Sequence, residues 1–146
     1  MKTTVKIMCM AIALSATFTS CNKTDKSEKD SDEIIGKQTV KLENGLMTPE
    51  TLWAFGRIGN VQVSPEEDKI LYSVSYYSVK QNRSNSELFV MNIDGTDKKQ
   101  ITKTPLKETA AKWIEGGDII AFISNESGSM QVWGMNPDGS GRRQIT

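Results

Sequence analysis

Histidine is absent from all 146 residues of this sequence. Without it no Ser-His-Asp or Cys-His relay can form, and the commonest metal ligand is missing. Both cysteines, Cys9 and Cys21, lie in the first 21 residues, so the remainder has no thiol for catalysis or metal binding. Basic and acidic residues balance at 18 each, which gives no argument for nucleic acid. We therefore expect no catalytic residue, metal, cofactor or nucleic-acid partner.

Long apolar runs are also missing. The longest mostly apolar stretch, residues 7–18, is too short for a bilayer, which needs about 20 apolar residues. Lys2 and Lys6 precede it, and small residues lead from it into Cys21. This order resembles a bacterial lipobox, although an ordinary cleaved signal is an alternative. We predict a lipoprotein signal peptide over residues 1–21, acylated at Cys21, and a lipid-anchored protein of the bacterial cell envelope, periplasmic or outer-membrane-associated.

The next segment is polar. Residues 22–33 contain no apolar side chain and carry charges of both signs. Such a composition buries too little surface to offset the entropy of folding. We predict a disordered tether over residues 22–45.

A short helix is predicted at the start of the folded part. Thr48 can cap it, Pro49 suits the first turn, Glu50 complements the helix dipole and Gly56 can end it. We expect Trp53 to pack this helix on the following structure, although a ligand platform is an alternative. Residues 46–59 are interpreted as this helix and its lead-in.

A repeat of 44 residues is the strongest pattern in the sequence. Residues 91–102 align with residues 135–146, with seven of twelve positions identical. Each copy has an Asp-Gly pair, typical of a hairpin turn, and ends in Gln-Ile-Thr. Periods in the forties are typical of β-propeller blades.

Each copy has the pattern of four strands. In the first we expect strands at residues 61–64, 69–77, 87–93 and 99–102, with a polar loop at 79–86. In the second we expect them at 110–114, 118–124, 130–136 and 142–146. The upstream halves align at an offset of 49, which predicts a loop five residues longer in the first copy.

These patterns predict an all-β fold. We expect an incomplete β-propeller of about two four-stranded antiparallel blades over residues 60–146, preceded by a short helix and a disordered lipoprotein leader. Residues 119–123 are all apolar, so apolar side chains would point to both faces of this strand. This pattern favours a sheet covered on both faces. A β-sandwich with two similar hairpins is the alternative.

Three further features have simple structural explanations. The Asp94 and Asp138 turns faintly resemble calcium loops but lack the other carboxylates. The basic pairs Lys98-Lys99 and Arg142-Arg143 are interpreted as exposed charge beside turns, with a partner-binding patch as the alternative. Glu66 and Glu67, which could be compared with paired glutamates that hold a substrate amine, are expected in an exposed turn.

The Asp-Gly hairpin and closing Gln-Ile-Thr resemble the TolB-type propeller repeat. The preceding segments narrow the match: the region from about residue 46 to 146 resembles bacterial dipeptidyl-peptidases of the prolyl oligopeptidase family. The resemblance depends on residues 47–53 (Met-Thr-Pro-Glu-Thr-Leu-Trp), 57–59 (Arg-Ile-Gly), 63–65 (Val-Ser-Pro), 70–72 (Ile-Leu-Tyr) and 84–88 (Ser-Asn-Ser-Glu-Leu).

The resemblance implies a function for the whole protein. In that family a propeller covers an α/β-hydrolase domain whose nucleophile lies in Gly-x-Ser-x-Gly, a motif that these residues lack. We expect the N-terminal propeller fragment of an envelope-anchored serine peptidase, which gates or positions peptide substrates for a hydrolase domain. The alternative is the start of a non-enzymatic TolB-like propeller that binds protein or glycan.

Overall fold

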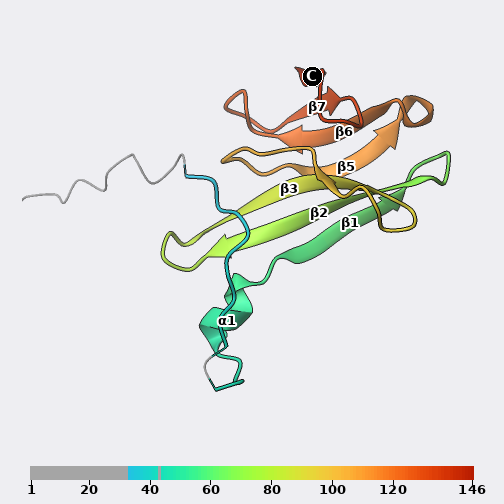
Figure 1. Cartoon of the computed structure of the whole chain (residues 1–146). Helices are drawn as coiled ribbons and strands as arrows, with labels where there is room; N and C mark the ends of the chain where they lie inside the picture. Colours follow the sequence, from blue (N-terminus) through green and yellow to red (C-terminus); the bar gives the residue numbers. More distant parts are fainter. Residues whose placement is uncertain (1–32, 43) are drawn as a thin grey trace, which may run out of the picture.

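A computed structural model describes residues 33–42 and 44–146. The predicted signal peptide, Cys21 and the first part of the predicted tether lie outside the described residues. One short helix precedes two four-stranded antiparallel sheets that lie one over the other (Figure 1). This confirms the predicted all-β class with two blades. No helix in the described part of the chain is long and apolar enough to cross a membrane.

The two sheets repeat one strand order. Blade one has the order β1-β2-β3-β4 and blade two the order β5-β6-β7-β8. The elements are α1 (Pro49–Ala54), β1 (Arg57–Val63), β2 (Lys69–Ser78), β3 (Arg83–Asn92), β4 (Lys99–Gln100), β5 (Thr109–Ile114), η2 (Glu115–Gly117), β6 (Ile119–Ser124), β7 (Gln131–Met135) and β8 (Arg143–Gln144). Several strand bounds therefore differ from the predicted ones, most of all for β1 and β3.

Helix α1 begins as predicted and ends earlier. The Thr48 hydroxyl accepts a hydrogen bond from the Thr51 backbone N–H at 3.2 Å, and Pro49 occupies the first position. The helix ends at Ala54, and Phe55 is extended. Gly56 therefore does not end the helix. A Cβ atom there would lie 2.7 Å from the Val74 side chain, so Gly56 allows the chain to pass close to β2.

The predicted polar loop at residues 79–86 is wrong in its second half. Residues 83–86 belong to β3, and the β2–β3 register continues to Ser78 opposite Arg83. Both strands have ten residues, whereas β6 has six and β7 five. The extra residues of blade one therefore lengthen its strands and not its loop. The polar side chains of residues 83–86 gave no strand pattern in the sequence. The backbone hydrogen bonds between strands nevertheless form with any side chain.

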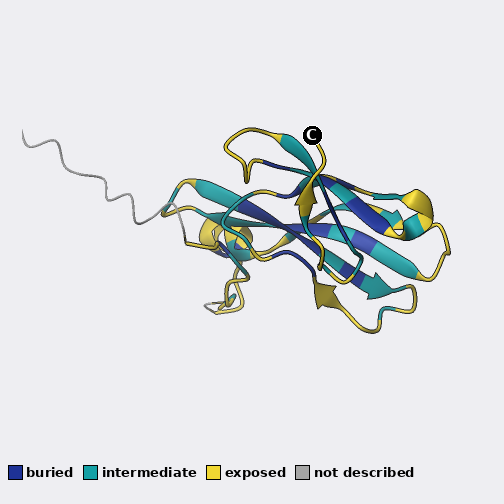
Figure 2. Ribbon diagram, turned by 90° about the horizontal axis from the view of Figure 1, so that it is seen from above, coloured by how far each residue is buried: buried dark blue, intermediate teal, exposed yellow. Residues whose placement is uncertain are grey.

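The core lies between the facing sheets. Its buried residues are Leu71, Leu88, Val90, Ile101, Ala111, Ile120, Phe122 and Met135, with Trp113 and Trp133 packed against it. Figure 2 shows buried residues along the central strands and exposed residues in the turns and on α1. Each Å² of apolar surface removed from water contributes about 25 cal/mol to stability. This shared apolar layer is therefore the main stabilising contact between the blades.

Each first strand contains an irregularity that the sequence did not indicate. The register shifts between Gly59 and Gln62 in β1 and between Thr109 and Lys112 in β5. Asn60 and Ala110 have φ values of 48° and 51° at these two places. The Asn60 side-chain amide donates to the Ala111 backbone oxygen at 2.6 Å, which joins the two irregularities.

Candidate functional site

A hollow of about 810 Å³ lies at the end of the blades where the long β2–β3 hairpin turns. Helix α1, this hairpin, the linker between β4 and β5, and the β6–β7 loop all contribute to it. It is lined by Trp53, Tyr77, Ser78, Val79, Asn82, Arg83, Ser84, Pro105, Leu106, Lys107, Thr109, Asn125 and Met130. Its size is within the range of small-ligand sites, about 300–1,000 Å³. Strand β2 is four residues longer than its equivalent β6, and the end of this longer hairpin forms one wall of the hollow.

Trp53 and Tyr77 form the aromatic wall of the hollow. Their ring centroids are 5.3 Å apart with the planes tilted. The Arg57 guanidinium carbon lies 4.5 Å from the Trp53 ring centroid and 4.3 Å from that of Tyr77. Trp53 thus packs α1 on β2 as expected, and it remains 40% exposed at the edge of the hollow.

The segment before α1 reaches the same end of blade one. Ile35 is buried, and the Gln38 side-chain amide donates to the Tyr77 backbone oxygen at 2.7 Å. The backbone oxygen of Glu33 accepts from Arg83 at 3.1 Å, while its carboxylate accepts from Gln81 at 2.6 Å. The chain therefore approaches α1 along the hairpin that lines the hollow. The predicted domain limits at residues 21, 45 and 59 remain predictions.

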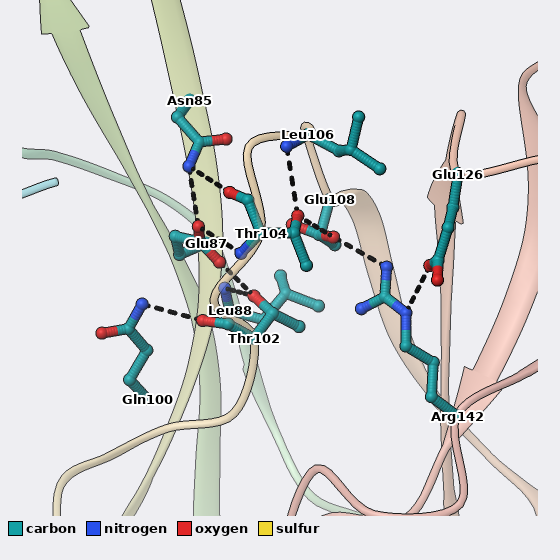
Figure 3. A network of polar contacts seen from close by, with 10 residues as sticks. All are labelled: Asn85, Glu87, Leu88, Gln100, Thr102, Thr104, Leu106, Glu108, Glu126 and Arg142. Atoms are coloured by element: carbon teal, nitrogen blue, oxygen red, sulfur yellow. Dashed lines mark hydrogen bonds and ion pairs between the residues drawn. The ribbon is translucent and has the colours of Figure 1, made fainter. Parts of the chain in front are cut away.

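A buried carboxylate, Glu87, lies on β3 beside the linker that follows β4 (Figure 3). It accepts hydrogen bonds from the Asn85 side-chain amide at 2.7 Å, the Thr102 hydroxyl at 2.7 Å and the Thr104 backbone N–H at 3.1 Å. Burial raises the pKa of Glu87 to about 7 although these hydrogen bonds lower it. The network fixes the linker after β4 against β3.

A second carboxylate, Glu108, is fully buried where the linker meets β5. The Arg142 guanidinium lies 2.8 Å from it and also binds Glu126 at 2.6 Å (Figure 3). Burial raises the pKa of Glu108, and the hydrogen bond from Arg142 is the largest opposing influence. The prediction that Arg142 is exposed is therefore wrong. A partner for it was not evident, because Glu108 and Glu126 are 34 and 16 residues away in sequence.

The closing Gln-Ile-Thr of each copy has the same hydrogen bonds. The Thr102 hydroxyl accepts from the Leu88 N–H and donates to Glu87, and the Thr146 hydroxyl accepts from the Val132 N–H and donates to Gln131. Glu87 and Gln131 are 44 residues apart, so they occupy equivalent positions. The repeat could therefore have identified Glu87 in the sequence. Both copies have the partner threonine, and the position that it contacts is an ionisable glutamate in blade one and a glutamine in blade two.

The other predicted positions lie away from the hollow. Lys98, Lys99 and Arg143 are exposed beside their turns, and Glu66 and Glu67 lie in an exposed turn, as expected. Asp94 and Asp138 each accept hydrogen bonds from the residue two positions later, Thr96 or Ser140, which accounts for both turns. Within residues 33–42 and 44–146, no three histidine, cysteine or acidic residues cluster as metal ligands would.

Comparison with known proteins gives a consistent result. No family model matches the sequence. Dipeptidyl-peptidase 5 of Porphyromonas endodontalis is 36% identical over 104 residues, which are 71% of this chain and 15% of the relative. The Porphyromonas gingivalis protein of the same name is 45% identical over 86 residues, 59% of this chain and 13% of the relative. This chain is similar to part of a dipeptidyl-peptidase. It spans about one-seventh of those relatives.

The sequence-based expectation that this chain resembles part of a dipeptidyl-peptidase is thus confirmed. Among solved structures, TolB from Agrobacterium tumefaciens is similar, with 24% identity and a TM-score of 0.47 over 57% of this chain and 28% of that one.

Proposed function

We propose that this chain is the N-terminal propeller portion of an envelope-anchored serine peptidase of the prolyl oligopeptidase family. In this proposal the blades gate or position peptide substrates for a hydrolase domain. The observation that carries it is the 36% identity to a dipeptidyl-peptidase over 71% of the chain. The peptidase chemistry itself would belong to other residues, because this sequence has no histidine.

The hollow supports the positioning role. It combines an aromatic wall, apolar side chains such as Leu106 and Met130, and amide groups from Asn82 and Asn125. Sites for small ligands typically combine apolar surface with a few polar groups that fix orientation. A short extended peptide has the same mixture, with apolar side chains and a polar backbone. The buried Glu87 network would hold the linker wall of this hollow in place.

The proposed anchor is compatible with this arrangement. Acylation of Cys21 would attach the protein to a membrane through residues that precede Glu33, and Glu33 lies beside the β2–β3 hairpin. The anchor is tested separately by metabolic labelling with a palmitate analogue. Wild type should incorporate the label and C21S should not, whereas equal labelling would contradict acylation of Cys21.

The peptidase proposal is tested on the protein purified from its complete gene. We expect release of dipeptides from dipeptidyl-coumarin substrates and labelling by a fluorophosphonate, which reacts with activated serines. The reading frame after Thr146 should encode further blades and then Gly-x-Ser-x-Gly. A frame that encodes blades alone, with no dipeptide release, would contradict the peptidase and leave the TolB-like binding protein as the better interpretation.

A further inference from the structure

The charged residues that line the hollow have one sign. Its lining includes Arg83 and Lys107 and contains no aspartate or glutamate. Arg57 adds a third cation, because it packs on the two aromatic rings of the wall. Among the described residues, neither Arg57 nor Lys107 forms an ion pair. Lys107 is exposed and lines the hollow, so its charge is available to a group that enters, and Arg57 adds positive charge next to the aromatic wall.

The nearby carboxylates have partners of their own, and that of Glu33, beside the β2–β3 hairpin, accepts a hydrogen bond from Gln81. Glu108 and Glu126, which lie next to lining residues in sequence, both bind Arg142. Glu87 is buried behind the linker and is held by three hydrogen bonds. Arg142 thus pairs with two of these acidic residues, and neither of them pairs with Lys107.

The rest of the lining is suited to apolar groups. The lining also contains Trp53, Tyr77, Pro105, Leu106 and Met130. We propose that the hollow is a subsite for a carboxylate carried on an apolar peptide. Such a carboxylate is either the C-terminus of a short peptide or an acidic side chain within it. This inference rests on the proposed peptide-positioning function and adds a preference for charge.

Three tripeptides test the preference by isothermal titration against the full chain. They are N-acetyl-Leu-Ala-Phe with a free C-terminus, the same peptide as its C-terminal amide, and the C-terminal amide of N-acetyl-Leu-Ala-Glu. We expect the two anionic peptides to bind about two- to fivefold more tightly than the neutral amide, the range for a partly exposed ion pair. The tighter of the two identifies the source of the carboxylate. Raising the salt from about 0.1 M to about 1 M should reduce the difference.

Variants locate the effect. Lys107→Gln should remove most of the difference between anionic and neutral peptides, and Arg57→Met, which keeps an apolar contact with the rings, should remove part of it. Lys103→Gln is the matched control, because Lys103 is an exposed lysine of the same linker outside the hollow. It should leave all three affinities unchanged. Circular dichroism checks that each variant is folded.

Two results would overturn the inference at different levels. If the neutral amide binds as tightly as the anionic peptides, or if Lys107→Gln and Lys103→Gln behave alike, the charge preference is wrong while peptide positioning stands. If none of the three peptides binds, the positioning function proposed for the hollow fails as well.

Discussion

The Arg142 guanidinium lies 2.8 Å from the carboxylate of Glu108, which is fully buried between the two blades. Arg142 belongs to the turn before β8, and Glu108 ends the linker from blade one. The guanidinium also lies 4.8 Å from the ring centroid of Phe122. One side chain therefore connects the last hairpin of blade two with the linker that forms a wall of the hollow.

Removal of this cation should destabilise the protein. Arg142→Gln leaves the Glu108 carboxylate buried without its charged partner, for which the cost is about 3–5 kcal/mol. Because the Arg142 side chain is 20% exposed, we expect about 2–4 kcal/mol in urea unfolding. The control Arg143→Gln changes an exposed neighbour and should stay within about 0.5 kcal/mol. Equal effects of the two substitutions would show that the Glu108 contact contributes nothing.

Stability should depend on pH through Glu87. Its pKa is about 7 in the folded protein and near 4.5 when exposed, so the folded state retains a proton that the unfolded state loses between these values. The free energy of unfolding should therefore fall by up to about 3 kcal/mol as pH rises from 4.5 to 7.

Glu87→Gln identifies the group responsible. Glutamine occupies the equivalent position 131 of blade two, where its oxygen accepts from Thr146. The variant should lose most of the decline measured by urea unfolding at several pH values. A residual decline of the same sign is expected from Glu108, whose pKa is also raised. An unchanged slope in the variant would assign the pH dependence elsewhere.

The two Asp-Gly turns should respond differently to alanine. Gly95 and Gly139 have φ values of +83° and +89°, so alanine is strained at both, by about 1–2 kcal/mol. A Cβ at Gly139 would lie 2.6 Å from the Ile101 backbone oxygen, whereas nothing lies within 4 Å at Gly95. Gly139→Ala should therefore cost about 1–3 kcal/mol more in thermal or urea unfolding. Equal costs would mean that the blade-two turn does not press on blade one.

The sequence predicted the parts of this fold that local patterns determine. The repeat of residues 91–102 in 135–146 gave two blades, and Thr48 with Pro49 gave the start of α1. Strand β3 was underestimated because its first residues, from Arg83 to Ser86, are polar and show no apolar strand pattern, although their backbone pairs with β2. The register shift near Ala110 has no marker in the sequence, whereas Asn60 is a residue type that tolerates a positive φ.

The site was less predictable because it depends on contacts between distant residues. Trp53 was recognised as a docking residue, but Tyr77 and Lys107, which line the hollow with it, are 24 and 54 residues away. Arg142 was interpreted as exposed because it belongs to a basic pair beside a turn, at the position equivalent to Lys98 in blade one. Only the tertiary structure places Glu108 and Glu126 on either side of Arg142.

The kinetics of dipeptide release by the complete gene product test the central proposal most directly, with Trp53→Ala compared with wild type. If the blades position peptides and other residues perform the chemistry, the variant should raise KM about three- to tenfold and leave kcat within about twofold. Leu52→Ala, another exposed apolar residue of α1 outside the hollow, should change neither. The account is contradicted if Trp53→Ala leaves KM unchanged, or if the complete gene product releases no dipeptides.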